Sequence, residues 1–344
     1  MDSVTHIVLG ACIGEAMLGR QIGKKAMLLG AVAQSLPDLD AVASLWLAPT
    51  ADLLAHRGFT HSLLCCALAA PLLALLARRL NRSHNVSVNR WTIFFAIELF
   101  VHIFLDAFNN YGTGWFEPFS HQRISFNVLY VADPLFTIFP LVATAVLVLL
   151  RRRHKRRKFW WRMAIIMCSL YLLMGIFNKI RVDKNVVASL ERQHISYDRY
   201  FTTPAPLQNV LWMVVAGSDS GYHVAYRSLF DNDTDLSFTY FPSNRGYLDT
   251  IIHYDDVQRL MQFSEGFFTV EKWSDTLVFN DLRFGQILGW QDPRERFVFH
   301  YFLTEPGSND LVVQRGRFSK WDKKSIRLFL RRISGIKLPK KYRD

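Results

Sequence analysis

The feature that most constrains this chain is the contrast in composition between its two halves. Residues 1–178 contain long apolar segments and hold 17 Lys and Arg against nine Asp and Glu. Residues 179–344 hold the remaining 24 and 20 and have the composition of a soluble protein. A length of 344 residues suits two domains. We therefore expect a membrane-embedded helical domain over residues 1–178 and a smaller α+β soluble domain over residues 179–344.

Six apolar segments predict that the first domain is an all-α polytopic membrane bundle of about six segments. Several of these segments are shorter than the roughly 20 residues that a full span needs. Short or interrupted segments are tolerated at membrane depth where they line a polar cavity. The segments run over residues 4–19, 26–48, 62–77, 91–110, 132–150 and 160–178.

Lys and Arg follow the first, third and fifth segments, with the largest group over residues 151–162. Because the positive-inside rule places such loops in the cytoplasm, six spans leave both termini and the C-terminal domain outside it. The same loops account for the net charge of +12, so that charge does not require a nucleic-acid partner. We expect a multi-pass protein of the inner, or cytoplasmic, membrane, without a cleavable signal peptide because Met1-Asp2 lacks a positive region.

Alternating apolar and aromatic runs predict strands in the C-terminal domain. Asn209–Ala216 and Tyr222–Phe230 flank a Gly217–Gly221 turn and predict a hairpin. Helical spacing is expected over Asp255–Phe263 and Ser319–Ser334. Further strands are predicted over Leu236–Phe241, Phe267–Trp273, Leu277–Phe279 and Arg296–Thr304. The four cysteines, which we interpret as inert packing residues, are Cys12, Cys65, Cys66 and Cys168.

Two motifs at the expected outer face combine carboxylates with histidine or proline. Asp2 and His6 are four residues apart, so on a helix they share a face and can meet one metal. The alternative is that Asp2 only caps the helix. Asp38 and Asp40 lie within an apolar segment, beside a proline that interrupts a helix. Their burial is costly unless they are paired or hydrated, although Asp38 also suits a helix cap.

Two further motifs carry histidines. His56 and His61 flank Arg57, whose guanidinium can receive an anionic oxygen, and Gly58 permits a turn that brings the two imidazoles together. A polar loop with Thr60 or Ser62 as a cap is the alternative. His102 and Asp106 share a helix face at the end of an apolar segment, where the alternative is a structural hydrogen bond.

The predicted topology brings all four motifs to one end of the bundle. So many imidazoles and carboxylates predict a divalent metal, Zn or Mn, with one ion or more. The expected ligands are His6, Asp38, Asp40, His56, His61, His102 and Asp106. Asp2 is expected to be a weaker ligand or a neighbour that orients one, and Arg57 is the candidate anion-binding group.

These motifs resemble the YdjM-like family of membrane-bound metal-dependent hydrolases. The resemblance covers residues 1–115 and implies an inner-membrane hydrolase with bound metal. His102 and Asp106 also look similar to ligands of zinc-dependent phospholipases C and single-strand nucleases, which favours a phosphoester substrate. The matching stretches are Asp2-x-x-Thr5-His6, Pro37-Asp38-Leu39-Asp40, His56-Arg57-Gly58-x-Thr60-His61-Ser62 and His102-x-x-x-Asp106 with Tyr111-Gly112.

The sequence thus predicts a membrane-bound enzyme that hydrolyses an ester or phosphoester of a lipid, or of another membrane-associated substrate, with metal-activated water. A metal-binding transporter or sensor without hydrolase activity is the alternative, since intramembrane His and Asp also mark ion paths. A third interpretation is a noncatalytic scaffold, in which residues 179–344 are the functional part. Clustering of the polar residues at one end favours the enzyme over a transport path.

Overall fold

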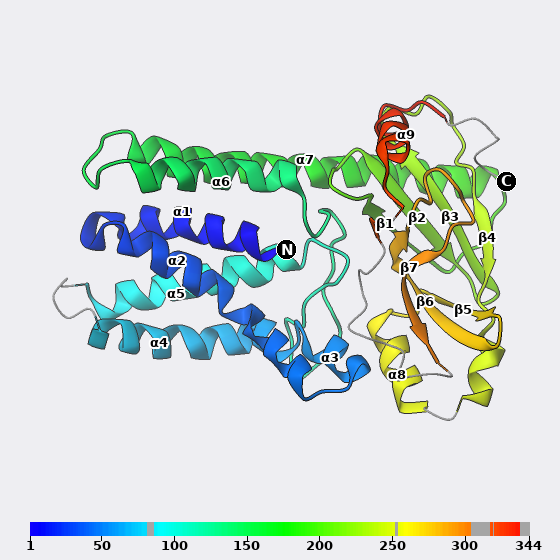
Figure 1. The fold of residues 1–344 in the computed structure, drawn as a ribbon, viewed down its shortest axis with the longest axis horizontal. Coiled ribbons are helices and arrows are strands. Elements are labelled where there is room, and N and C mark those ends of the chain that lie inside the picture. The colour runs from blue at the N-terminus through cyan, green and yellow to red at the C-terminus, as the bar shows by residue number, and fades with distance from the viewer. Residues whose placement is uncertain (81–85, 252–253, 304–316, 319, 338–344) are drawn as a thin grey trace. The chain divides into compact units, whose positions relative to one another are not determined.

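The computed structural model describes residues 1–80, 86–251, 254–303, 317–318 and 320–337, and its elements are drawn in Figure 1. The chain divides into two compact units. The first, here called the helical unit, comprises Met1–Leu45, Ala55–Gly175 and Pro206–Gln208. The second, here called the sheet unit, comprises Trp46–Leu54, Ile176–Ala205 and Asn209–Asp344.

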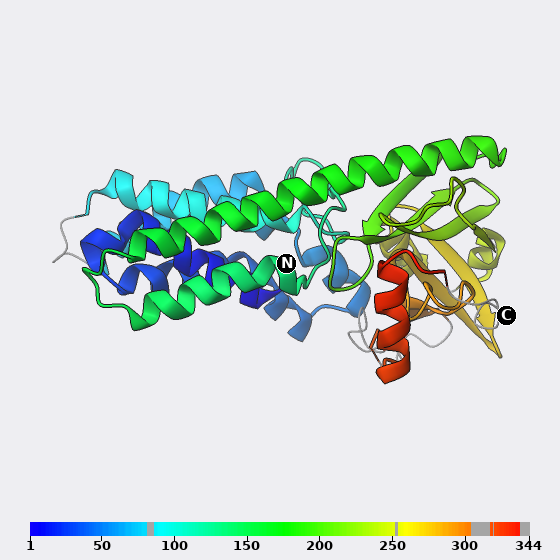
Figure 2. The ribbon, with the colours of Figure 1, turned by 90° about the horizontal axis from the view of Figure 1, so that it is seen from above.

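The helical unit consists of helices joined by short 3₁₀ segments and loops. In both Figures 1 and 2, α6 and the first part of α7 run side by side. Helix α1 packs against α2, α5 and α6, and α4 packs against α5. The elements are α1 (Ser3–Ile22), α2 (Lys25–Ser35), η1 (Pro37–Leu45), η2 (Phe59–His61), α4 (Leu63–Leu80), α5 (Val88–Asp106), α6 (Pro134–Leu149) and the first part of α7 (Arg157–Arg192).

Three of the described helices, α4, α5 and α7, are long and apolar enough to cross a membrane. Helix α6 is a shorter apolar helix. The apolar segment expected over residues 26–48 is not one helix, because α2 ends at Ser35 and η1 begins at Pro37. Proline lacks an N–H and clashes with the preceding turn, so the α-helix stops before it. The described helices that are long and apolar enough to cross a membrane are thus fewer than the six expected segments. The expectation that the first half is helical is confirmed.

The backbones of α1 and α2 approach each other closely at glycines. A Cβ added at Gly14 would lie 2.1 Å from the carbonyl oxygen of Ala26, and one at Gly10 would lie 2.5 Å from that of Gly30. Small residues four apart on a helix allow such contact in membrane proteins. The contact holds the start of α1 beside the end of α2, where Gln34 lies buried.

The sheet unit contains two antiparallel sheets, with strand orders β1-β2-β3-β4 and β5-β6-β7. Helix α7 continues into this unit, where it packs against the larger sheet. The elements are α3 (Pro49–Ala55), β1 (Arg199–Pro204), β2 (Leu211–Gly217), β3 (Gly221–Ser228), β4 (Thr239–Pro242), η4 (Arg245–Thr250), α8 (Tyr254–Phe263), β5 (Phe268–Trp273), β6 (Thr276–Gln286), β7 (Phe297–Phe302) and α9 (Lys323–Ile333).

Strand β2 is buried on both faces, which explains why its sequence is apolar throughout. Side chains alternate between the faces of a strand. Accordingly, Trp212 and Val214 pack with Val186 of α7, whereas Met213 and Val215 join a core with residues of β6 and β7. Burial on both sides makes β2 the centre of this unit.

The predicted hairpin is confirmed, because β2 ends at Gly217 and β3 begins at Gly221. Strands were also expected near β4, β5, β6 and β7, and helices near α8 and α9. Strand β1 was not predicted; it is polar, and its pairing with β2 determines its conformation. Thr304 and Ser319, at the ends of two predicted segments, lie outside the described residues.

Gly14→Ala should destabilise the helical unit, because the added methyl group meets backbone that cannot move aside. Overpacking of this kind costs about 1–3 kcal/mol. Thermal unfolding of the purified protein in detergent should therefore start at a lower temperature. The control is Gly246→Ala, since a Cβ at Gly246 meets nothing within 4 Å. Equal melting temperatures for the two variants would contradict the close packing of α1 and α2.

Candidate metal centre

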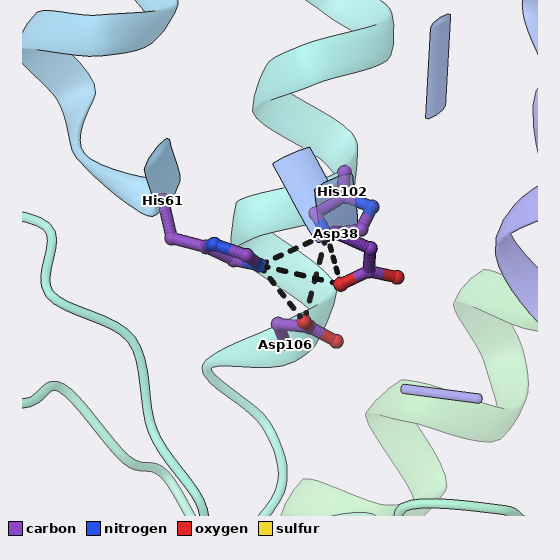
Figure 3. Close-up of side chains that lie close together, drawn as sticks. All are labelled: Asp38, His61, His102 and Asp106. Atoms are coloured by element: carbon purple, nitrogen blue, oxygen red, sulfur yellow. Dashed lines mark hydrogen bonds and ion pairs between the residues drawn. The ribbon is translucent and has the colours of Figure 1, made fainter. Parts of the chain in front are cut away.

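Four potential metal ligands meet at one end of the helical unit (Figure 3). Asp38 comes from η1 and His61 from η2, while His102 and Asp106 share one face of α5, four residues apart. Each offers one donor atom, and the four donor atoms lie within 4.8 Å of one another. The sequence motifs therefore converge in space, although three separate elements supply them.

The spacing of these donors suits a small cation. The Nε2 atoms of His61 and His102 are 3.1 Å apart. Each Nε2 lies 3.5–3.6 Å from Asp38 Oδ1 and from Asp106 Oδ2. Four donors about 2.0–2.1 Å from a tetrahedral metal ion would be about 3.3 Å apart, close to these values.

The hydrogen bonds of the outer ring nitrogens point to the same conclusion. His102 Nδ1 lies 2.5 Å from the backbone oxygen of Gln34, which can only accept, so this nitrogen carries the proton. His61 Nδ1 faces Asp40 Oδ2 at 3.2 Å. In the neutral rings both Nε2 atoms then present lone pairs to each other. A bound cation would remove that repulsion.

Asp106 contains an orphaned acceptor at the same place. Its side chain is fully buried, and its Oδ2 has no hydrogen-bond partner, with the Arg57 Nε 3.4 Å away in an ion pair. A buried carboxylate oxygen without a partner is costly unless a cation compensates it. The oxygen faces the two Nε2 atoms, so these four residues fit a divalent metal with nitrogen and oxygen ligands.

His6 belongs to the wall of this cluster. Its ring stacks on that of His102, with centroids 3.9 Å apart, and its Nε2 lies 3.1 Å from Asp106 Oδ1. The other ring nitrogen faces the Gln34 side chain at 3.4 Å. Both nitrogens of His6 thus have partners, and the geometry places it as a support for Asp106; its role as a ligand stays a prediction.

Asp40 and His56 lie on the outer side of His61. Asp40 Oδ1 is 2.8 Å from His56 Nδ1, and its Oδ2 accepts hydrogen bonds from the Thr60 hydroxyl and the Arg57 backbone. Burial raises the pKa of Asp40, but hydrogen bonds from His56 and His61 lower it more, so the carboxylate stays ionised. A carboxylate behind a ligating imidazole fixes the ring and raises its basicity.

Arg57 is buried at the edge of the cluster. Its Nη1 donates to Asn109 Oδ1 at 3.0 Å, and its guanidinium lies over the Tyr111 ring, 5.0 Å from the centroid. Its Nε lies 3.4 Å from Asp106 Oδ2. Arg57 itself has a left-handed φ of 62°, so the turn expected at Gly58 involves Arg57 as well. Such conformations in a non-glycine residue are concentrated at functional sites.

Asp2 caps α1. Its carboxylate accepts hydrogen bonds from the backbone N–H and the hydroxyl of Thr5, at 3.0 and 2.6 Å. These bonds satisfy one of the free N–H groups at the helix start. The capping alternative therefore describes the contacts of Asp2, and its part in the chemistry stays a prediction.

Gln34 and Asn109 are site residues that the motifs did not single out. Gln34 contacts His6 with its side chain and His102 with its backbone, and Asn109 holds Arg57. Both are fully buried. The available signal was a polar amide within or just after an apolar segment, which is weak because amides also cap and turn helices.

Comparison with known proteins gives a family match over the helical part of the chain. The family described as YdjM inner membrane protein matches residues 1–182, which include every residue of the cluster. The chain belongs to the YdjM family. This confirms the resemblance seen in the motifs and supports a location in the inner membrane. No solved structure matches the chain.

Two relatives share part of the chain. The inner membrane protein YbcI of Escherichia coli (strain K12) is 30% identical over 122 residues, which cover 35% of this chain and 69% of YbcI. The uncharacterized protein YfhP of Bacillus subtilis (strain 168) is 30% identical over 154 residues, which cover 42% of this chain and 46% of YfhP. The chain therefore spans less than half the length of YfhP.

His61→Ala and His102→Ala should each lower the amount of bound metal, because each removes one of four converging donors. Metal content of the purified protein, measured by mass spectrometry, checks this. The matched control is His121→Ala, whose ring is exposed and pairs with Glu117. Unchanged metal content in both cluster variants, with intact folding, would favour a purely structural role for the histidines.

Proposed function

We propose that the protein is a membrane-bound metal-dependent hydrolase. The convergence of His61, His102, Asp38 and Asp106 supports this proposal most directly. When bound, a divalent metal lowers the pKa of a water molecule and polarises a substrate oxygen. Zn and Mn suit a donor set of two imidazoles and two carboxylates better than Mg does.

A substrate must be able to reach the metal ligands from outside, and the side of the cluster at Asp38 is open to it. Its side chain is 22% exposed, whereas those of His61, His102 and Asp106 are completely buried. A substrate can therefore reach the cluster only past Asp38, among these four ligands. The protected sides keep the other donors in place and exclude competing water.

Arg57 is proposed to bind an anionic group of the substrate. Its contacts with Asn109 and Tyr111 hold the guanidinium plane, and its buried Nε makes an ion pair with Asp106 Oδ2 at 3.4 Å but no hydrogen bond. A fixed guanidinium suits the oxygens of a phosphoester. The positive charge of Arg57, beside the fully buried Asp106, would compensate negative charge on a substrate bound at the cluster.

The substrate is proposed to be an ester or phosphoester of a membrane lipid. Asp106 is the last residue of α5, one of the helices able to cross a membrane. The cluster thus lies where that apolar span ends, at the depth of lipid headgroups. A lipid ester would enter such a site without leaving the membrane surface.

Arg57→Ala should reduce kcat/KM on an anionic lipid phosphoester by about tenfold or more, because a charge-assisted hydrogen bond is lost. The loss on a neutral ester should be smaller, and metal content should be unchanged. Arg57→Lys keeps the positive charge but lacks the planar guanidinium, so its kcat/KM should lie between those of the wild type and Arg57→Ala. Equal losses on charged and neutral substrates would contradict anion binding, and faster turnover of a soluble phosphoester would contradict a lipid substrate.

The sheet unit is proposed to lie outside the cytoplasm, on the basis of the basic loops at residues 151–162 and elsewhere. A reporter that is active only outside the cytoplasm, fused after Asp344, should therefore be active. The same reporter fused within residues 151–156 should be silent. Activity of a cytoplasm-specific reporter after Asp344 would overturn the orientation without affecting the metal centre.

A further inference from the structure

The helical unit contains a second polar site, distant from the metal centre. It is a cavity of about 670 Å³ between the end of α1, the start of α5 and the loop that joins α6 to α7. Arg20 on α1 lines it, 14 residues beyond His6, which corresponds to about 21 Å along the helix. The cavity therefore cannot be part of the candidate metal centre.

The lining of this cavity is strongly cationic. Among the described residues that line it are eight Lys and Arg side chains and one carboxylate, that of Glu15. Arg157 binds that carboxylate with two hydrogen bonds, from Nε at 2.7 Å and from Nη2 at 2.6 Å. Both side chains are buried, so this pair neutralises itself at the base of the cavity. Seven positive charges then remain without a carboxylate in the lining.

Two of these cations are held by helix carbonyls. Arg152 Nη2 donates to the backbone oxygens of Arg20 and Gln21, at 3.2 and 2.6 Å, near the end of α1. Arg90 Nη2 donates to the backbone oxygen of Met17 at 3.1 Å. Unsatisfied carbonyls and the negative dipole end of a helix attract such cations. These bonds fix two guanidinium groups at the cavity wall.

The chemistry of the lining selects an anion with several oxygens. Seven like charges around one cavity repel each other, and a bound anion would relieve that repulsion. Guanidinium groups bind phosphate oxygens in pairs, and most of the lining cations are Arg. The cavity volume lies within the range of small-molecule sites. A phosphate-bearing anion satisfies charge, geometry and size together.

The position of the cavity favours a lipid source for that phosphate. Arg90 lies in the first turn of α5 and Arg157 begins α7, and both helices are able to cross a membrane. The cavity therefore opens where apolar spans begin, at headgroup depth. We propose that it is a binding site for a phosphate-bearing anion, with an acidic phospholipid headgroup as the form that its position favours.

The test uses the full-length protein in detergent, with bound lipid measured by native mass spectrometry. The probes are phosphatidylglycerol, zwitterionic phosphatidylcholine and soluble pyrophosphate. The variant Arg153→Gln/Lys158→Gln removes two exposed cations of the cavity. The matched control, Arg151→Gln/Arg156→Gln, removes two exposed cations of the same loop that do not line it.

Phosphatidylglycerol should bind the wild type and the control alike, within about twofold, and the cavity variant about tenfold more weakly. Metal content should be the same in all three proteins. Tight binding of pyrophosphate with no preference for phosphatidylglycerol would support the phosphate site and assign it to a soluble ligand. Equal loss in both variants, or equal binding of phosphatidylcholine, would overturn the proposal, because general loop charge would then explain the binding.

Discussion

The close contact between the backbones of α1 and α2 determines where the buried polar groups of the helical unit meet. Without Cβ atoms at Gly10 and Gly14, the two helices approach until carbonyl oxygens limit them. This contact brings His6 of α1 beside Gln34 of α2, and the backbone oxygen of Gln34 in turn accepts a hydrogen bond from His102 Nδ1. The orientation of a central imidazole therefore depends on helix packing two steps away.

Burying ionisable groups beside an apolar span costs free energy. In this cluster several polar contacts offset that cost. Asp40 supports His61 from behind, and Arg57 approaches Asp106 from the side. These contacts leave Asp106 Oδ2 without a hydrogen bond, with Arg57 Nε 3.4 Å away, and leave two imidazole nitrogens facing each other. The polar groups of the protein therefore do not satisfy one another fully at the centre of the cluster, and the spacing of the donor atoms there suits a metal ion.

The two ends of the helical unit have opposite chemistry. One end gathers histidines and carboxylates that attract a cation, and the other gathers Arg and Lys around a cavity. This separation of charge fits the proposed orientation, in which the end rich in Lys and Arg faces the cytoplasm. Two charges at the ends are paired with the opposite sign: Arg157 neutralises Glu15, and Arg57 lies beside Asp106.

The sequence by itself determined the helical first half, the hairpin around Gly217–Gly221 and the residue types of the site. Helix periodicity alone places His102 and Asp106 on one face, since positions four apart always meet. Hydropathy was a weaker guide to span number, because the proline at position 37 splits an apolar segment that reads as continuous.

Only the tertiary structure decided which polar groups bind which. Asp38 and Asp40 are two residues apart in the sequence, yet one faces the cluster centre and the other supports His61 and His56 from outside. The pairing of Gln34 with His102, 68 residues apart, and the left-handed backbone at Arg57 follow from packing that no local pattern encodes. Local periodicity fixes the face on which a side chain lies, whereas its partners depend on neighbours from other elements.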